Sequence, residues 1–166
     1  MKIELFSLKE GKNAFHFEED SAVLELPKEL ATQGVVQVDG TVRKQGTRLF
    51  LKAVARMTLD AECSRCLEPF HVPLTVPIEI YYTIGADKTD HRKESELIHI
   101  TNGDQNIDLL GQVRESILLG IPIKPLCGED CKGLCLQCGT NLNEETCDCV
   151  ARPPDPRWAA LEALRK

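Results

Sequence analysis

The stretch that decides the fold runs from residue 48 to residue 59 and reads Arg48-Leu49-Phe50-Leu51-Lys52-Ala53-Val54-Ala55-Arg56-Met57-Thr58-Leu59. Apolar side chains recur here at every second position, which is the period of a strand with one buried face. The face predicted to be buried consists of Leu49, Leu51, Ala53, Ala55, Met57 and Leu59. The opposite face is polar and predicted to be exposed, and the stretch is therefore a half-buried strand.

Two neighbouring runs show the same alternation and extend this strand into a sheet. The run before it places Val36, Val38 and Val42 on one face, and Lys44-Gln45-Gly46 supplies a turn. The run after it forms an unbroken apolar face from Phe70, Val72, Leu74, Val76, Ile78, Ile80 and Tyr82. Pro73 and Pro77 fall on the other face, where their missing N–H groups predict a sheet edge or a bulge. The sequence thus predicts an antiparallel β-meander or a partly open barrel.

A helix is predicted after the sheet. Leu109, Leu110, Val113, Ile117 and Leu118 recur at helical spacing, with Asp108 as the N-cap and Gly120 followed by Pro122 as the end. This helix is expected to pack on the sheet. Residues 86–96, between sheet and helix, are almost entirely polar and predict a solvated, mobile loop.

Taken together, the predicted strands and the helix indicate an α+β protein with three regions. Residues 1–126 form a core domain of antiparallel β-structure and the packed helix, and residues 127–150 form a Cys-rich zinc-binding segment. Residues 151–166 are a proline linker and a short terminal helix, whose apolar side holds Trp158, Leu161 and Leu164.

Composition limits the function classes. The 166 residues suffice for one main core, and the net charge of −6 argues against a protein that coats nucleic acid through bulk electrostatics. No apolar run is long enough to span a membrane, and no signal peptide is recognisable, so a cytoplasmic location is expected. In a reducing compartment the eight cysteines point to metal binding rather than to disulfides.

The cysteines occur in pairs with metal-ligand spacing. Cys63 and Cys66 enclose two residues, as do Cys135 and Cys138, and this spacing lets both thiolates face one tetrahedral ion. Gly139 after the second pair gives it the form of a zinc knuckle. Cys147 and Cys149 follow after a short connector, so the four thiols from Cys135 to Cys149 are predicted to share one zinc ion.

A second site is predicted from Cys63, Cys66, Cys127 and Cys131. The alternative joins Cys63 and Cys66 to the knuckle at Cys135 and Cys138, and leaves Cys127, Cys131, Cys147 and Cys149 together; loop closure favours the first pairing. Two structural zinc ions are therefore expected. Catalysis is not, because four sulfurs close the coordination shell. Iron–sulfur ligation is the chemical alternative, and none of His16, His71, His91 and His99 has a ligand-like spacing.

A basic face with one aromatic side chain is a possible contact for RNA. The residues concerned are Arg43, Arg48, Phe50, Lys52 and Arg56. Phosphate pairing and base stacking would suit this composition. The solvated side of a half-open sheet is normally charged in the same way, and that interpretation is favoured.

The linked motifs resemble the bacterial YceD-like family, in its cysteine-rich branch. They are Cys63-Ser64-Arg65-Cys66-Leu67-Glu68-Pro69-Phe70, Asn106-Ile107-Asp108-Leu109, Ile121-Pro122-Ile123-Lys124-Pro125-Leu126-Cys127, and the cysteine-rich run from 131 to 149 with the terminal Asp155-Pro156-Arg157-Trp158. The resemblance implies a role in synthesis, processing or stability of large-subunit (23S) ribosomal RNA.

A non-enzymatic ribosome-biogenesis factor is the function expected from the resemblance together with the closed zinc sites. Its expected partners are pre-ribosomal large-subunit RNA, a ribosomal protein, or both, with no membrane and no small-molecule substrate. A zinc-bearing adaptor in RNA turnover and, less favoured, a ribonuclease are the alternatives.

Overall fold

The computed structural model describes residues 1–27, 34–85, 97–101, 103–150 and 157. The elements in chain order are β1 (Lys2–Glu4), the 3-10 helix η1 (Leu5–Ser7), β2 (Gly11–Asp20), the 3-10 helix η2 (Ser21–Leu24), β3 (Val35–Gln45), β4 (Arg48–Glu62), β5 (Pro69–Ile84), β6 (Leu97–Ile100), β7 (Asn106–Asp108) and α1 (Leu110–Gly120). The mobile loop predicted at 86–96, and the terminal helix with Trp158, Leu161 and Leu164, lie outside the described residues.

The main sheet has five strands in the order β2-β3-β4-β5-β6, and β1 pairs with β7 in a separate two-stranded sheet. The predicted antiparallel meander is present as β3, β4 and β5. The sheet as a whole is mixed, however, because β6 pairs with β5 in parallel. The described strands form an open sheet, so the barrel alternative is not confirmed.

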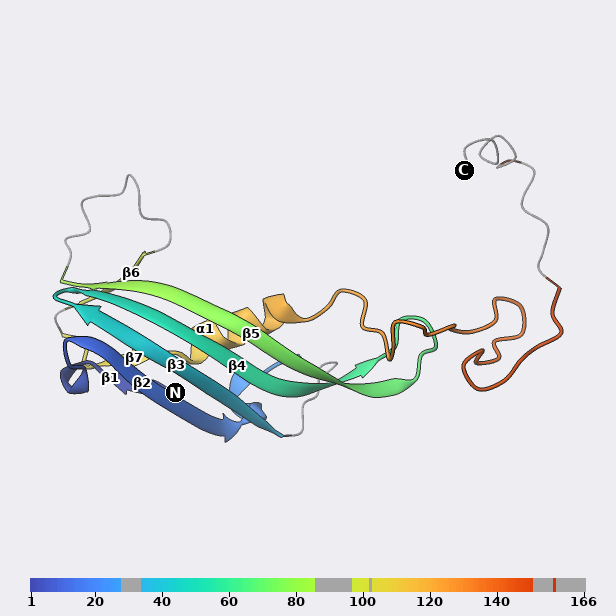
Figure 1. The fold of residues 1–166 in the computed structure, drawn as a ribbon, viewed down its shortest axis with the longest axis horizontal. Coiled ribbons are helices and arrows are strands. Elements are labelled where there is room, and N and C mark those ends of the chain that lie inside the picture. Colours follow the sequence, from blue (N-terminus) through green and yellow to red (C-terminus); the bar gives the residue numbers. More distant parts are fainter. Residues whose placement is uncertain (28–33, 86–96, 102, 151–156, 158–166) are drawn as a thin grey trace.

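The predicted strand faces are confirmed by burial. Val36, Val38 and Leu51 are fully buried, and the other predicted inward positions of β4 are nearly so. Helix α1 covers this inner face beside β5, with Val113 and Ile117 buried (Figure 1). Burying one such aliphatic side chain contributes about 1.5–3 kcal/mol. Gly120 allows the helix to approach closely, because a Cβ there would lie 2.6 Å from Val76 Cγ2.

The sequence predicts Asp108 as the N-cap of the helix, but the helix begins at Leu110 and its N-cap is Leu109, so Asp108 lies one residue before the cap. Its Oδ1 accepts a hydrogen bond from the N–H of Leu110 at 3.0 Å. The backbone position before the first helical residue belongs to Leu109, whose side chain is 1% exposed. A carboxylate and a buried leucine therefore fix the start of α1 together.

The two prolines of β5 lie on the open edge of that strand, as predicted. The antiparallel register continues without interruption through Thr58↔Pro73 and Val54↔Pro77. On its other side β5 pairs with β6 only from Tyr81 to Ile84. Proline lacks the N–H that would pair with an added strand, so Pro73 and Pro77 protect the part of the edge that β6 leaves uncovered.

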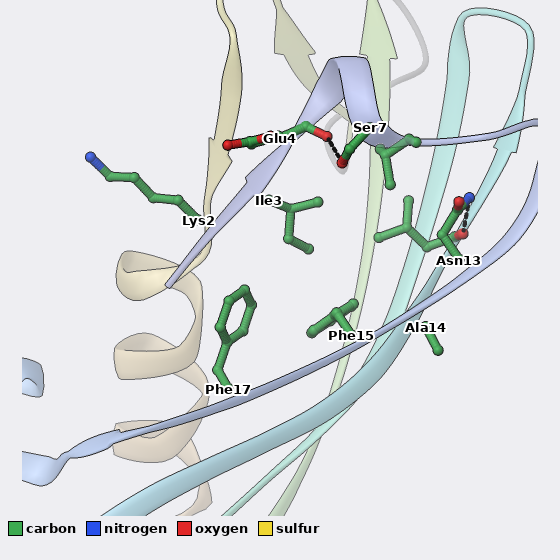
Figure 2. Close-up of a pocket in the computed structure, with 10 residues that line it drawn as sticks. Lys2, Ile3, Glu4, Ser7, Asn13, Ala14, Phe15 and Phe17 are labelled. Atoms are coloured by element: carbon green, nitrogen blue, oxygen red, sulfur yellow. Dashed lines mark hydrogen bonds between the residues drawn. The ribbon is translucent and has the colours of Figure 1, made fainter.

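The N-terminal strands and β6 are elements that the sequence pattern did not predict. In β2 the side chains of Phe15 and Phe17 lie on the same face of the strand, toward the core, with ring centroids 5.5 Å apart. They point, together with Ile3 of β1, into a cleft of about 380 Å³ between the two sheets (Figure 2). Gly40 of β3 makes room for Phe15, because a Cβ there would lie 2.6 Å from the ring.

Strands β4 and β5 extend beyond the rest of the sheet. Pairing between β3 and β4 ends at Gln37↔Arg56, whereas β4 and β5 stay paired as far as Glu62↔Pro69. The projecting end of this hairpin meets the chain that follows α1, and the Cys-rich segment continues outward from there (Figure 1). The sheet thereby holds Cys63 and Cys66, which follow β4, at one end of the molecule.

Candidate metal centres

The first pair of cysteines forms a tight turn at the end of the β4–β5 hairpin. The N–H of Leu67 donates to the carbonyl of Cys63 at 2.9 Å, and the N–H of Cys63 donates to the carbonyl of Glu68 at 2.9 Å. The N–H of Arg65 points at the sulfur of Cys63, 3.5 Å away. Leu67 adopts a left-handed φ of 61° to complete the turn.

The second pair forms the same turn. The N–H of Gly139 donates to the carbonyl of Cys135 at 2.9 Å, and the N–H of Cys135 donates to the carbonyl of Thr140 at 2.8 Å. The N–H of Gln137 lies 3.5 Å from the sulfur of Cys135. Gly139 has a φ of 77° and occupies the position of Leu67 in the first turn. A left-handed leucine costs about 1 kcal/mol, which the paired hairpin and the hydrogen bonds of the turn offset. We call these turns knuckle 1 (residues 63–67) and knuckle 2 (residues 135–139).

The first cluster joins knuckle 1 to the chain after α1. The sulfur atoms of Cys63, Cys66, Cys127 and Cys131 all lie within 4.8 Å of one another. The Cys63–Cys131 and Cys66–Cys127 sulfur pairs are each 3.7 Å apart. A tetrahedral ion with zinc–sulfur bonds of about 2.3 Å requires sulfur–sulfur distances of about 3.8 Å. The four thiols therefore fit one tetrahedral ion, and Phe70, Leu126 and Leu134 pack around them.

The second cluster is formed within the Cys-rich segment alone. The sulfur atoms of Cys135, Cys138, Cys147 and Cys149 also lie within 4.8 Å of one another. The structure thus groups the cysteines as in the favoured pairing and not as in its alternative. This cluster is more exposed than the first, in which Cys63, Cys66 and Cys131 are buried. Each of the two four-cysteine clusters could hold a metal ion.

The pKa is lowered at two thiols of each cluster, Cys63 and Cys131 in the first and Cys135 and Cys138 in the second, with hydrogen-bond donors as the cause that favours the thiolate. The backbone N–H of Cys127, followed by that of Cys66, lowers the pKa of Cys63 to about 6. The hydroxyl of Thr140, whose oxygen lies 3.2 Å from the sulfur, lowers the pKa of Cys138 to about 6. Neighbouring thiols raise the pKa of Cys127 and of Cys149 to about 12, with Cys131 and Cys138 as the respective main causes. A cation would relieve this repulsion, so the donor set suits a divalent metal.

Hydrogen bonds between knuckle 1 and the chain after α1 hold the first cluster together. Arg65 Nη1 donates to the carbonyls of Glu129 and Cys131, at 3.2 and 2.8 Å. The N–H of Ser64 donates to the carbonyl of Pro125 at 2.9 Å. The first cluster therefore fixes the end of the hairpin to a segment about sixty residues further along the chain. This is the connection expected from the favoured pairing of Cys63 and Cys66 with Cys127 and Cys131.

Asn143 connects the two clusters. Its Nδ2 donates to the sulfur of Cys131 in the first cluster at 3.4 Å, and its Oδ1 accepts from the N–H of Lys132 at 2.7 Å. Asn143 itself lies in the connector between Cys138 and Cys147 of the second cluster. An ordered second cluster therefore positions a donor on a sulfur of the first. The sequence analysis missed this residue, because an asparagine in a turn-rich connector gives no signal of its own.

Replacing Asn143 with alanine is expected to weaken metal binding at the first cluster by about 10-fold, the lower end of the range for groups that hydrogen-bond to metal ligands. The reason is the loss of one donor to the thiolate of Cys131. Competition with a chelator, followed by zinc counting in native mass spectrometry, measures the effect. Glu144→Ala, at the next and exposed position, is the matched control and should leave both affinities unchanged. Equal affinities in the Asn143 variant and the parent would contradict this role.

The residues of the predicted basic face lie on the outer side of the sheet, where two of the four cations are paired with carboxylates. Lys52 Nζ lies 2.7 Å from Glu79 and Arg56 Nη1 lies 2.8 Å from Asp39. The ring of Phe50 stacks on Tyr81 with centroids 4.6 Å apart, and Arg43 is the cross-strand neighbour of Phe50. Arg48 lies opposite Thr83 at the same end of the hairpin. The middle of this face therefore carries paired charges, and Arg43 and Arg48 lie near the Phe50–Tyr81 stack at one end of it.

The histidines take no part in the clusters among the described residues. His16 lies 2.7 Å from Asp39, and His71 lies 2.6 Å from Asp60, both on the exposed face of the sheet. His99 is exposed on β6 and has no shared cluster with cysteine within the described part of the chain. His91 lies outside the described residues.

The fold and the clusters define a class of protein: its described residues form a mixed open sheet with one α-helix and two clusters of four cysteines, each of which could hold a metal ion. Residues 51–165 match the family described as "Large ribosomal RNA subunit accumulation protein YceD". The chain belongs to this family. No helix among the described residues is long and apolar enough to cross a membrane.

Similar proteins occur in plants and mycobacteria. The chain is 28% identical over 156 residues to "Large ribosomal RNA subunit accumulation protein YCED homolog 1, chloroplastic" of Arabidopsis thaliana, covering 79% of this chain and 49% of that protein. It is 32% identical over 148 residues to the protein of the same name from Zea mays, covering 74% of this chain and 50% of the relative.

An uncharacterised protein of Mycobacterium tuberculosis is 34% identical over 100 residues, covering 60% of this chain and 47% of the relative. The chain thus spans about half the length of the curated relatives that it matches. No solved structure matches it.

Proposed function

We propose that this protein is a non-enzymatic factor that supports the accumulation of large-subunit (23S) ribosomal RNA during ribosome biogenesis. The observation that carries the proposal is membership of a family described by ribosomal RNA accumulation, with the match including all eight cysteines. The compartment proposed is the cytoplasm, although the two plant relatives are named as chloroplastic.

Zinc is the metal proposed for both clusters, in a structural role. Four thiolates at tetrahedral spacing are typical of structural zinc, whereas catalytic zinc keeps an open position for water or substrate. The sulfur–sulfur distance of 3.7 Å in the first cluster suits a single ion. A multi-iron cluster would hold its cysteine ligands on different iron atoms and farther apart. Colourless purified protein with two zinc ions per chain is the expected result.

Direct partners are proposed to include a ribosomal or assembly protein. The net charge is −6, and the two cations of the predicted RNA face that lie mid-sheet, Lys52 and Arg56, are paired with carboxylates. Bulk attraction to phosphate is therefore weak. The RNA face, if it contributes, does so through the Phe50–Tyr81 stack with Arg43 and Arg48 beside it.

Depletion of the protein is expected to lower the ratio of 23S to 16S ribosomal RNA by about twofold or more and to reduce free and assembled large subunits in sucrose gradients. Re-expression of the parent chain restores the ratio, and re-expression of a variant with both clusters disrupted does not. Normal ratios after depletion would refute the proposal. A ribonuclease activity is tested separately: purified protein is expected to leave precursor 23S RNA uncut.

A further inference from the structure

Knuckle 1 and knuckle 2 have the same backbone hydrogen bonds but differ in what covers their tips. The tip of knuckle 1 is Ser64 and Arg65. It is covered by two separate positions of the chain itself, because the N–H of Ser64 donates to the carbonyl of Pro125 at 2.9 Å and the carbonyl of Arg65 accepts from the N–H of Leu134 at 3.1 Å. Two backbone groups on the tip of a knuckle can thus pair with backbone groups of another part of a chain.

At the tip of knuckle 2 the contact with the chain itself is made by a side chain, because Gln137 Nε2 donates to the carbonyl of Val150. Leu136 and Gln137 occupy the positions of Ser64 and Arg65. Within the described part of the chain, neither the N–H of Leu136 nor the carbonyl of Gln137 has a backbone partner. The side chain of Leu136 is 103% exposed, whereas Leu134, which faces knuckle 1, is partly buried. An apolar residue and two free backbone groups therefore lie at the same tip.

A groove of about 820 Å³ adjoins this tip. The groove is lined by three leucines, by two polar residues and by three cysteines of the second cluster: Leu134, Leu136, Leu142, Lys132, Gln137, Cys135, Cys147 and Cys149. Leu136 alone would be an ordinary exposed leucine. Joined to a groove with two other leucines, it forms a continuous apolar surface of the kind that receives an apolar side chain.

The charge of the surrounding segment selects the kind of partner. Residues 127–150 contain five carboxylates, at Glu129, Asp130, Glu144, Glu145 and Asp148, against the single charge of Lys132. All of these side chains are exposed. Such a surface repels the phosphates of RNA and attracts lysine and arginine.

We propose that knuckle 2 and its groove form a docking surface for an extended, basic segment of a protein partner. That segment would pair with the N–H of Leu136 and the carbonyl of Gln137, the groups equivalent to those that Pro125 and Leu134 bind at knuckle 1, and place an apolar side chain against Leu136. This mode adds an extended peptide to exposed backbone groups, with pockets for its side chains. The inference rests on the proposed function and specifies its partner as protein rather than RNA at this surface.

A photocrosslinking amino acid at position 136, introduced into the full-length protein in cells, tests the proposal. The matched control carries the same group at Leu119, which is 80% exposed on α1. The expected result is a protein crosslinked at 136 through a peptide rich in lysine and arginine, with a yield at least tenfold above that at 119. Crosslinks to RNA, crosslinks to this chain's own residues after Val150, or equal yields at both positions would each overturn the proposal.

A synthetic peptide with the crosslinked sequence then provides the quantitative test. Leu136→Asp is expected to weaken its binding at least tenfold, and Leu119→Asp to leave it unchanged, while both variants keep two zinc ions. Unchanged binding by Leu136→Asp would contradict the docking surface. These readouts measure binding, so a normal 23S to 16S ratio after depletion would refute the proposed function without affecting them. Unchanged peptide binding by Leu136→Asp would refute the docking surface and leave the proposed function standing.

Discussion

Cys63→Ser is expected to remove one of two zinc ions and to lower the stability of the β4–β5 hairpin more than any other single cysteine change. Cys63 is fully buried, and its sulfur lies 3.7 Å from that of Cys131, so Cys63→Ser would leave three thiolates and a poorer oxygen ligand at the site. The first cluster also ties residue 63 to the chain beyond α1. Losing a cross-link across such a loop costs roughly 2–4 kcal/mol, by analogy with a disulfide of similar span.

Cys147→Ser is the matched variant for the second cluster. It is expected to remove the other zinc ion and to leave the unfolding temperature of the sheet nearly unchanged, because the second cluster closes only a short local loop. Native mass spectrometry counts the zinc ions, and circular dichroism at strand wavelengths follows thermal unfolding. If Cys63→Ser and Cys147→Ser removed the same ion, the grouping of the cysteines would be wrong.

The central strands could be predicted from the sequence because their signal is strong and local. In β3, β4 and β5 one face is buried and the other solvated, so the period of two is visible over more than ten residues. Helix α1 was visible for the same reason, with a buried stripe that includes Val113 and Ile117. An element with one continuous buried face has a periodic sequence that can be recognised without its partners.

The other strands could not be predicted because they are short, or because they form only through pairing with distant parts of the chain. β1, β6 and β7 each have only three or four residues, too few for a period to emerge. β2 is longer, and Phe15 and Phe17 on one face are the apolar pattern that could have revealed it. These side chains are only half-buried, however, so the pattern is weak. The parallel pairing of β6 depends on where the chain returns after residue 85, which no local pattern records.

The cysteine grouping was predictable in outline, and the hydrogen bonds around it were not. Spacing and loop length indicated which thiols could reach one ion, without any knowledge of the sheet. The similarity of the two knuckles was hidden, because Leu67 stands where a glycine is expected and only its φ of 61° reveals the shared turn. Asn143 and Arg65 likewise act through hydrogen bonds to Cys131, and folding alone brings these segments of the chain together.

Acidification is expected to release both metal ions, since zinc binds thiolates and protons compete for the same sulfurs. Without metal, the pKa values of Cys127 and Cys149 are raised to about 12, so both are protonated at neutral pH and must lose a proton on binding. Affinity therefore rises with pH, about tenfold per unit for each proton displaced. Below a pH of about 6 the thiols of Cys63 and Cys138, with pKa values of about 6, take up protons as well, and the dependence steepens.

The pH dependence is measured as zinc released to a chromophoric chelator between roughly pH 8 and roughly pH 4, while strand signal is followed in parallel. The stabilisation supplied by the metal is present at neutral and higher pH and is lost as the pH falls, because protons displace the metal from the thiolates that hold it in the folded state. The second cluster, which is the more exposed, is expected to empty first. Thr140→Val gives the control: without its hydroxyl the pKa of Cys138 rises, so the second cluster should empty at a higher pH while the first is unchanged. Release that is independent of pH would show that the ligands are not these thiolates.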